Sequence, residues 1–565
     1  MRGNGAQFEF CEGSRPFCYN EGMQATSFKV PTPINEPIFG YLKNSKEREA
    51  LKNALSKIES TVVEIPCVIG GKEIRTGNIF EIRMPHDHQH VIAKVHLAGE
   101  AEVKLAIDAA LQAKKDWENL PWYERAKVFL KAADLLATTY RPMINAATMH
   151  GQSKNPYQAE VDSACELIDF LRFNAHFYEK LMEDQPLSVS GIHNSVDYRP
   201  LEGFVFAVTP FNFTAIAGNL PSAPALIGNT VVWKPSEQQC LAAYITMQVF
   251  QEAGLPAGVI NFLPANGAVA GGIALNHREL AGVHFTGSSA TFNHIYKTIG
   301  SRIDTYHSYP RIVGETGGKD FVFAHPSADI DVLNVALIRG AFEYQGQKCS
   351  AASRAYIPAS LWSKLQSKLV AEVEAIKMGD VRDFRNLVNA VIDDRSFKKI
   401  SSYLEWAKSD SNVKILSGGT ADSKTGYFVR PTILQTTDPM AKTMCEEIFG
   451  PVLTLYVYED AKLRETLKIA NETSPYALTG AVIAQDRSAL QLMSQELRHA
   501  AGNFYLNDKP TGAVVGQQPF GGARQSGTND KAGSSMNLLR WVSARTIKEN
   551  FVPPKSILYP YMDEA

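Results

Sequence analysis

From residue 201 to residue 285 the chain alternates between short apolar runs and helical stretches, and this alternation limits the folds open to it. Apolar runs predict strands at 203–208, 229–234, 259–263 and 282–285, and the spacing of apolar residues predicts helices between them. Strands that alternate with helices indicate a parallel, doubly wound sheet. Such sheets bind ligands in a crevice at the carboxyl ends of their strands. We therefore expect an α/β fold with a binding site along that edge.

A second α/β unit is predicted from about 317 to 505, because 565 residues are too many for one core. Its expected strands include 321–323, 354–357, 452–457 and 481–483. Asp329 or Asp331 is expected to cap a helix that reaches Tyr344, with Gly346 able to end it. Helices are also predicted at 45–59 and through 99–180, a hairpin turn at 70–71, and strand in the tail at 540–565.

Composition excludes several classes of protein. The formal net charge is −2, which gives no basis for sequence-independent binding to nucleic acid, and no apolar run is long enough to span a bilayer. Seven cysteines, an odd number without a Cys-x-x-Cys pair, argue against a disulfide framework or a zinc knuckle and favour a reducing compartment. Residues 1–30 are expected to be a lead-in without regular structure, and they do not form a clear transit peptide or secretory signal.

Cys349 is the candidate nucleophile. It stands in a polar loop that follows a predicted helix and a Gly-Gln-Lys turn, where a thiolate could approach a carbonyl and Lys348 could favour the anion. The alternative is a buried cysteine that acts as a small hydrophobic residue. The polar flanks favour the nucleophile.

Glu315 and Asn212 are the candidate partners of that thiol. Glu315 lies in a glycine-rich turn at a strand end, where it could activate water to hydrolyse a thioester. Asn212 follows another buried strand, and its amide could stabilise an oxyanion together with the backbone N–H of Cys349. Taken alone, Glu315 could be a solvated turn residue and Asn212 a turn-former.

Two further strand ends could hold a dinucleotide. Lys234 could donate to ribose hydroxyls, and Glu237 could accept from a 2′-hydroxyl and repel a 2′-phosphate. Thr286, Gly287 and Ser288 open a helix after a strand, which suits a pyrophosphate. The alternative for Glu237 is an ordinary acidic residue in a first helical turn. No Gly-x-Gly-x-x-Gly motif follows the first strand.

His86, His88 and His90 alternate in strand-like sequence and could place three imidazoles on one face. We favour a solvated hairpin over a metal site, and we predict no metal.

The pairing of Gly314-Glu315 with Gln347-Lys348-Cys349 resembles the aldehyde dehydrogenase superfamily, and the resemblance runs from about 34 to 550. The superfamily usually has Leu where this chain has Thr316, which we interpret as a branch difference. The stretches 501–508 and 516–530 are similar to its pyrroline-carboxylate branch.

The resemblance implies a Rossmann-like NAD-binding domain (34–180 and 202–314), an α/β catalytic domain (315–539), a small β-flap for oligomerisation (181–201 and 540–565) and an N-terminal extension (1–33). It implies NAD-dependent oxidation of L-glutamate γ-semialdehyde to L-glutamate in proline breakdown, through a thiohemiacetal and a thioester on Cys349. A mitochondrial location and a homodimer are implied as well.

The resemblance also implies roles for residues that the pattern alone does not assign. Glu447 would hold the nicotinamide ribose, and Phe449 would pack beside the ring. Ser350, Gly512 and Ala513 would seat the substrate's α-carboxylate, and Phe213 and Phe520 would flank its methylenes. The branch often has Ser where this chain has Ala513, but the backbone donors do not depend on that side chain.

Two other classes of function compete with this reading. A thiol hydrolase or acyltransferase would use Cys349 and Glu315 without a nicotinamide, and Lys234 and Glu237 argue against it. A catalytically silent protein of the same fold would not need Cys349, Glu315 and Asn212 together.

Overall fold

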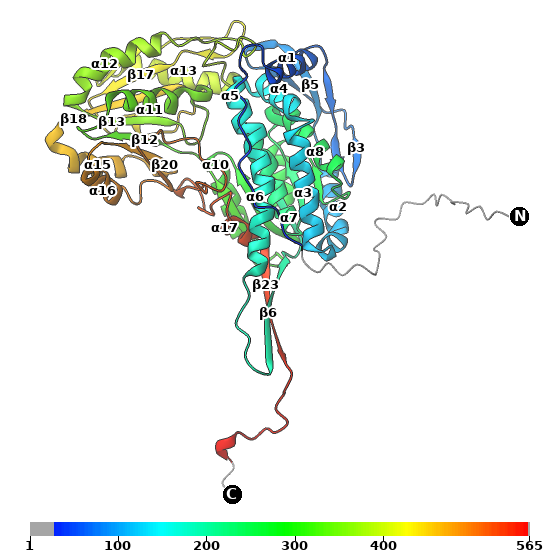
Figure 1. Ribbon diagram of the computed structural model, residues 1–565. Coiled ribbons are helices and arrows are strands. Elements are labelled where there is room, and N and C mark those ends of the chain that lie inside the picture. Colours follow the sequence, from blue (N-terminus) through cyan, green and yellow to red (C-terminus); the bar gives the residue numbers. More distant parts are fainter. Residues whose placement is uncertain (1–27, 563–565) are drawn as a thin grey trace, which may run out of the picture.

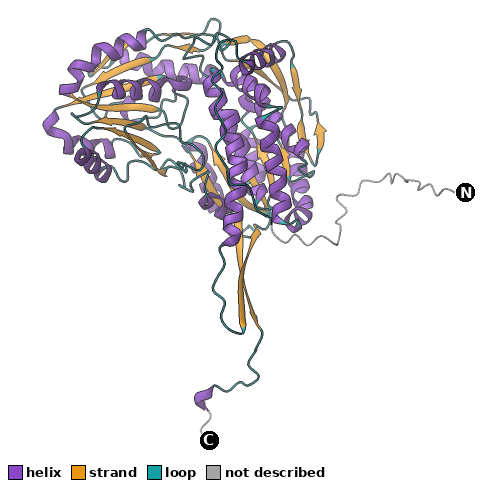
Figure 2. Cartoon of the chain, viewed as in Figure 1, coloured by secondary structure: helices purple, strands orange, loops and turns teal. Residues whose placement is uncertain are grey.

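The computed structural model describes residues 28–562, which build two α/β halves and a narrow two-stranded projection (Figure 1). Helices cover the sheets in both halves (Figure 2). Of the lead-in expected over 1–30, residues 1–27 lie outside this range. Residues 28–30 form no helix or strand, as expected, but they are packed against the first half: Val30 is buried, and the Phe28 ring lies 5.6 Å from the Trp122 ring.

The first half contains the predicted doubly wound sheet. Its order is β11-β10-β7-β8-β9-β2-β3, parallel from β11 to β9 and antiparallel at β2 and β3. The strands are β2 (Cys67–Ile69), β3 (Lys72–Ile74), β7 (Phe204–Val208), β8 (Thr230–Lys234), β9 (Ile260–Phe262), β10 (Leu280–Thr286) and β11 (Arg311–Glu315). The predicted turn at 70–71 joins β2 to β3, and both glycines have positive φ, 55° and 76°.

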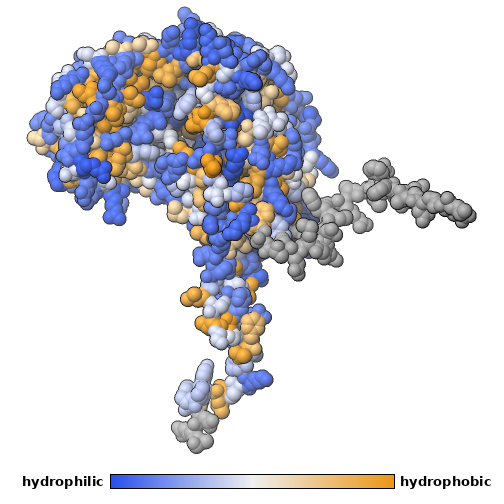
Figure 3. Space-filling view, viewed as in Figure 1, coloured by the Kyte–Doolittle hydropathy of each residue, from blue (hydrophilic) through white to orange (hydrophobic). Residues whose placement is uncertain are grey.

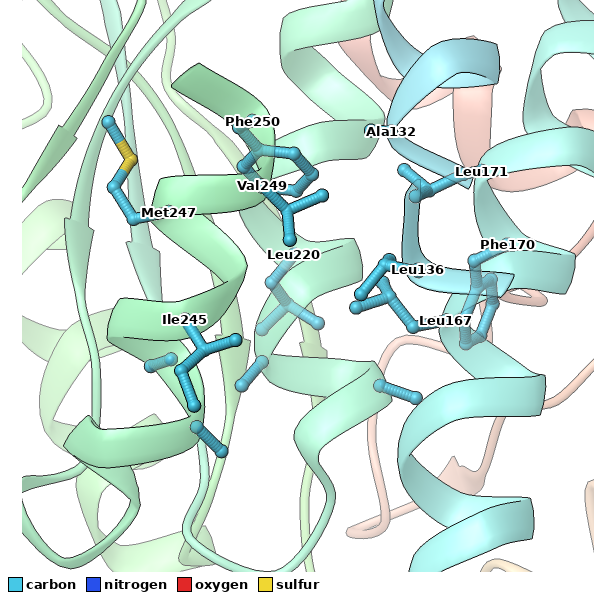
Figure 4. Packing of buried hydrophobic residues seen from close by; sticks show 14 of the residues in the cluster. Ala132, Leu136, Leu167, Phe170, Leu171, Leu220, Ile245, Met247, Val249 and Phe250 are labelled. Carbon is cyan, nitrogen blue, oxygen red and sulfur yellow. The ribbon is translucent and has the colours of Figure 1, made fainter. Parts of the chain in front are cut away.

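Strand β7 shows why this sheet is buried on both faces. Successive side chains of a strand point to opposite faces, and here Phe204 and Phe206 enter one apolar cluster whereas Val205 and Ala207 enter another. The second cluster is built by helices that pack against each other (Figure 4). The first face carries α2 (Glu100–Asn119), α9 (Gly267–Ala274) and α10 (Ser289–Gly300), and the second α3 (Trp122–Ala137), α6 (Glu166–Glu183), α7 (Thr214–Leu226) and α8 (Cys240–Ala253).

The N-terminal helices agree with the periodicity. The helix expected at 45–59 is α1 (Lys46–Glu59), and the Ser45 hydroxyl accepts a hydrogen bond from the Arg48 N–H as its N-cap. The helical stretch at 99–180 is divided into separate helices, and Pro142 stands in the first turn of α4 (Arg141–Gln152). A π-helical turn, Glu160–Cys165, leads into α6.

The second half has a seven-stranded sheet of order β14-β17-β18-β13-β12-β20-β21, in which only the β14–β17 pair is antiparallel. The strands are β12 (Asp320–Ala324), β13 (Ala352–Pro358), β14 (Val413–Ser417), β17 (Thr432–Thr436), β18 (Val452–Tyr458), β20 (Thr479–Ile483) and β21 (Asn503–Leu506). Alternation along β12 again divides the core, because Val322 and Phe323 belong to different clusters.

The helix before Cys349 ends earlier than the sequence indicates. Asp329 caps α11 (Ile330–Phe342), as predicted, through hydrogen bonds from the N–H groups of the first turn. The helix stops at Phe342, because Tyr344 and Gln345 adopt left-handed conformations with φ of 49° and 54°. Such angles are uncommon for residues other than glycine, so the approach to the cysteine loop is a sharp, specific turn.

The tail forms the predicted strand only over Val542–Asn550, and Pro560–Met562 is a short 3₁₀ turn. Strands β6 (Ile192–Pro200) and β23 (Val542–Asn550) pair antiparallel along nine residue pairs and project away from both halves (Figure 1). None of the helices within 28–562 has the length and apolar character that a membrane span needs.

Candidate active site

Many of the predicted site residues surround one cavity of about 280 Å³. Residues from the first sheet and from the cysteine loop meet there. The predicted residues among its lining are Phe213, Thr286, Glu315, Cys349, Ser350, Gly512, Ala513 and Phe520. The other predicted residues do not line it: Asn212, Lys234, Glu237, Gly287, Ser288, Glu447 and Phe449. The candidate nucleophile, the candidate base and the candidate substrate residues therefore share one space.

Cys349 stands on the loop between α11 and β13, with its thiol partly exposed to the cavity. Burial raises the pKa of the Cys349 thiol well above its usual range, and the nearby carboxylates of Asp320, Glu315 and Glu447 raise it further. The thiol is therefore protonated at neutral pH in this environment. It must lose its proton before it can attack a carbonyl.

The suggestion that Lys348 favours the thiolate does not agree with the geometry. The Lys348 ammonium is buried and lies 3.5 Å from Asp162 and 3.6 Å from Glu343. Asp162 also accepts a hydrogen bond from Lys154 at 2.9 Å. The positive charge of Lys348 is thus neutralised inside a buried ionic cluster, and the sequence could not show where a side chain next to Cys349 would point.

Glu315 is the last residue of β11, and it pairs in register with Thr286 of β10. Its carboxylate accepts a hydrogen bond from the Gly522 N–H at 2.8 Å. Burial raises the pKa of Glu315 well above its usual range, and the Gly522 N–H and Lys531 oppose that rise only in part. A raised carboxyl pKa is what a general base near neutral pH requires.

Asn212 lies just outside the cavity, in the loop between β7 and α7. It is buried, and its side-chain amide donates a hydrogen bond to the backbone carbonyl of Gln347 at 3.0 Å. An amide carries two N–H donors, so this bond fixes the side chain against the cysteine loop and leaves one donor for another acceptor.

The candidate carboxylate seat contacts the cysteine loop directly. The hydroxyls of Ser350 and Thr511 lie 2.8 Å apart. Gly512 has a φ of +95°, a conformation that side chains rarely adopt. Phe213 is buried against the Lys154 ammonium, which lies 4.3 Å from the ring centre. The candidate seat therefore joins loops that are 161 positions apart in the chain.

The candidate dinucleotide residues lie along the carboxyl edge of the first sheet, where the strand pattern predicted them. The Lys234 ammonium lies 3.0 Å from the Glu237 carboxylate. Ser288 is the N-cap of α10, and its hydroxyl accepts a hydrogen bond from the Thr291 N–H at 3.3 Å. Buried Lys234, an acid beside it and the start of a helix suit a ribose and a pyrophosphate. The residues present therefore fit NAD.

Glu447 and Phe449 lie where the second half faces this edge. The Glu447 carboxylate accepts a hydrogen bond from the Gly318 N–H at 3.1 Å, three residues after Glu315. Phe449 has a φ of 62°, and its ring meets the Phe211 ring edge-on with centres 5.8 Å apart. Both residues thus contact loops that begin at the carboxyl ends of strands of the first sheet.

Each of the three histidines has a different hydrogen-bond partner. The expected solvated hairpin does not describe His86, which is buried. His86 is buried, with Nδ1 3.1 Å from the Ser153 hydroxyl. His88 and His90 hydrogen-bond to the carbonyls of Ser423 and Glu59, respectively. Within residues 28–562, no group of three or more His, Cys, Asp or Glu side chains is placed so that it could hold a metal ion.

The sequence analysis missed an acidic wall of the cavity. Asp162, Glu166 and Asp169 line it from the π-helical turn and α6. Burial raises the pKa of Glu166 to about 8 and the pKa of Asp169 to about 6. Asn35 and Glu36 close the same side. Helical spacing predicts that residues at i, i+4 and i+7 share a face, but it does not show that the face borders Cys349.

The fold and this cavity define an oxidoreductase of the aldehyde dehydrogenase class. The model of the aldehyde dehydrogenase family matches residues 73–547, and the chain belongs to that family.

Within this family, the chain is similar to several named proteins along nearly its whole length. The chain is 55% identical over 536 residues to a mitochondrial delta-1-pyrroline-5-carboxylate dehydrogenase of Dictyostelium discoideum, covering 94% of this chain and 96% of that protein. It is 48% identical over 538 residues to the human mitochondrial enzyme of the same name, covering 95% of each. The crystal structure of the Mycobacterium tuberculosis delta-pyrroline-5-carboxylate dehydrogenase bound with NAD superposes with a TM-score of 0.93 at 53% identity, covering 95% of this chain and 100% of that one.

Proposed function

We propose that this chain oxidises L-glutamate γ-semialdehyde to L-glutamate with NAD, the second step of proline degradation. One observation carries the proposal: Cys349 and Glu315 line the same cavity as Ser350, Gly512 and Ala513. A nucleophile and a base thus share their space with backbone donors suited to a carboxylate. The names of the relatives, which cover nearly the whole chain, support the same substrate.

Cys349 acts first. The thiol first gives its proton to water; the thiolate sulfur then bonds to the aldehyde carbon as the carbonyl π bond breaks, and the carbonyl oxygen becomes the oxyanion of a thiohemiacetal. The second N–H of the Asn212 amide and the Cys349 N–H stabilise that oxyanion. The bond from Asn212 to the Gln347 carbonyl keeps the amide oriented, because the carbonyl lies two residues before the nucleophile.

Glu315 acts after the substrate carbon has been oxidised to a thioester. It takes a proton from water, the water oxygen bonds to the acyl carbon, and the thiolate of Cys349 leaves. The product is glutamate, with its new γ-carboxylate. The hydrogen bond from Gly522 holds the Glu315 carboxylate while the pKa stays high enough to accept that proton.

NAD, when bound, accepts the hydride that leaves the substrate carbon. Lys234 and Glu237 would hold the adenosine ribose, and Thr286, Gly287 and Ser288 would hold the pyrophosphate at the start of α10. Glu447 would hold the nicotinamide ribose, and Phe449 would pack beside the ring.

The backbone N–H groups of Gly512 and Ala513 and the Ser350 hydroxyl bind the α-carboxylate, and Phe213 and Phe520 flank the methylenes. A site with buried donors rejects analogues that lack the acceptor. Purified protein with NAD should therefore oxidise pyrroline-5-carboxylate, which opens to the semialdehyde in solution, far better than propanal, measured as reduced nicotinamide. Similar kcat/KM for both would contradict the substrate, and thioester hydrolysis without any reduction of NAD would support a thiol hydrolase.

We further propose the domain boundaries 34–180 with 202–314 for NAD binding, 315–539 for catalysis, and 181–201 with 540–565 for a flap that joins two copies into a homodimer. The projecting β6–β23 pair supports the flap, because an exposed strand edge favours pairing. Apolar side chains appear on this projection (Figure 3). Directly after β23, Phe551 and Val552 are 62% and 70% exposed. Light scattering at micromolar concentration should give the mass of a dimer, and a monomer would contradict the proposal.

We also propose a location in the mitochondrial matrix. The support is that the relatives from Dictyostelium discoideum and human are named mitochondrial. Cell fractionation with a matrix marker tests this, and a cytosolic distribution would contradict it.

A further inference from the structure

Residues 30–41 form an extended strap that lies along α4 and α6. The N–H of Val30 donates to Glu179, and the N–H of Phe39 donates to Glu160. Glu36 forms ion pairs with Arg141 and with Arg172, at 2.5 and 2.6 Å. The strap is thus fixed at both ends and in the middle by groups that are mostly buried, and it holds one orientation on the helices.

Asn35 is the residue of this strap that reaches the substrate loop, residues 511–518. Its side-chain amide donates two hydrogen bonds, to the Asp169 carboxylate at 2.8 Å and to the backbone carbonyl of Val515 at 2.9 Å. Its side-chain oxygen accepts a third from the Gln517 amide at 2.8 Å. Both N–H donors of the Asn35 amide therefore have acceptors, one on α6 and one on the loop.

The loop's own hydrogen bonds close a turn at 514–518: the Gln517 and Gln518 N–H groups donate to the Val514 carbonyl, and the Val514 N–H donates to the Gln518 side chain. None of these bonds reaches α6. Gly512 and Gly516 both have positive φ, +95° and +80°, and glycine allows a wide range of backbone conformations. Gly516 packs so closely on α6 that an added Cβ would lie 2.2 Å from the Phe173 ring. The position of the loop relative to α6 therefore depends on the close packing of Gly516, on the buried Val515 side chain and on the hydrogen bonds of Asn35.

We propose that Asn35 is a positioning residue: its amide fixes loop 511–518 against α6 and so keeps the N–H groups of Gly512 and Ala513 aimed into the cavity. That these groups bind the substrate's α-carboxylate rests on the proposed function. Asn35 touches neither the reacting atoms nor that carboxylate seat, so its loss affects substrates that carry the carboxylate and spares aldehydes that lack it.

Asn35→Asp is the sharpest variant. It keeps the size and the acceptor for Gln517, but it replaces the donor with an oxygen that faces the Asp169 carboxylate and the Val515 carbonyl. We expect kcat/KM for glutamate γ-semialdehyde to fall about five- to tenfold, mainly through KM, which is the size of effect that one or two hydrogen bonds give. With propanal, kcat/KM should change less than about twofold. Ile34→Ala, one residue away and 80% exposed, is the matched control and should behave as wild type.

Amide hydrogen exchange tests the tether without any substrate. Exchange over 511–518 should be faster in Asn35→Asp than in wild type, whereas peptides of β12 should be unchanged. Gln517→Ala, which removes only the third bond, should give a smaller effect, and the two changes together should be less than additive.

Unchanged exchange over 511–518 would overturn the proposal, and so would an equal loss of kcat/KM with propanal and the semialdehyde. If wild-type protein does not oxidise the semialdehyde, the proposed function fails, and the exchange result still decides whether Asn35 holds the loop.

Discussion

The hydroxyl of Ser350 lies 2.8 Å from the hydroxyl of Thr511, although the two residues are 161 positions apart in the chain. Ser350 directly follows Cys349, and Thr511 directly precedes Gly512, whose backbone turns with a φ of +95°. The contact therefore links the loop that carries the nucleophile to the loop that carries the candidate carboxylate seat. A substrate held by one loop is placed at a defined distance from the other, which is how binding contacts assist a reaction at a remote atom.

Ser350→Ala should raise KM for glutamate γ-semialdehyde about five- to tenfold, because it removes a donor to the α-carboxylate and loosens Thr511. Steady-state kinetics with propanal should show no comparable change. Ser363→Ala, on the exposed face of α12 (Ala359–Glu374), is the matched substitution. An equal effect on both aldehydes would mean that Ser350 supports the fold of the loop rather than the substrate.

Cys349→Ala should abolish oxidation of aldehydes and leave NAD binding intact. The covalent adduct needs the sulfur, whereas the candidate dinucleotide residues other than Thr286 lie outside the cavity that contains it. Turnover assays measure the loss of aldehyde oxidation, and calorimetry measures whether NAD binding is intact. Cys445→Ala tests a second partly exposed thiol and should retain activity. More than trace turnover in Cys349→Ala would refute the assignment of the nucleophile.

Glu315→Gln should slow release of the acyl group but not the reduction of NAD. About one reduced nicotinamide per site should form in a rapid burst, because the thioester accumulates. Rapid-mixing absorbance measures the burst, and Glu405→Gln on α13 (Asp394–Ser409), which is exposed, should show none. Wild-type steady turnover in Glu315→Gln would make Glu315 a turn residue only.

The raised pKa of Glu315 gives this step a pH dependence with a definite sign. A general base acts in its deprotonated form, and burial raises the pKa of Glu315 well above the ordinary value of a glutamate. The rate of deacylation should therefore rise with pH across and above neutrality, rather than reach its plateau in mild acid. Single-turnover decay of the acylated enzyme, followed against pH, measures this, and a flat profile from mild acid upward would contradict it.

Much of the fold could be predicted because its determinants are local. The apolar run at 203–208 became β7, from Phe204 to Val208, since a strand covered on both faces must be apolar throughout. Asp329 was expected to cap a helix, and it does. The end of that helix was misplaced, because Tyr344 and Gln345 take left-handed conformations against their intrinsic preference. Buried tertiary contacts hold both residues there, and no local pattern contains them.

In the candidate site, too, local features could be predicted from the sequence and long-range contacts could not. Thr286 and Glu315 follow from strand ends, and the structure pairs them in register. The interpretation of Lys348 failed, because its ammonium reaches Asp162, 186 positions earlier, instead of the neighbouring thiol. The contact of Asn35 with the substrate loop could not be predicted from the sequence for the same reason, since its hydrogen bond to Val515 joins residues 480 positions apart. A local sequence pattern does not contain contacts between residues so far apart in the chain.

The last prediction concerns the choice of dinucleotide. Glu237 lies 3.0 Å from Lys234 at the carboxyl end of β8, where a doubly wound sheet places the adenosine ribose. Its negative charge should repel a 2′-phosphate, so wild-type protein should prefer NAD to NADP. Glu237→Gln keeps the size and a hydrogen-bonding oxygen but removes the charge. We expect kcat/KM with NADP to rise about tenfold, the factor that about 1.4 kcal/mol of relieved repulsion gives, while kcat/KM with NAD falls less. Glu252→Gln, an exposed acid near the other end of α8, should change neither value. Equal efficiency of wild type with both cofactors would show that Glu237 does not face the ribose.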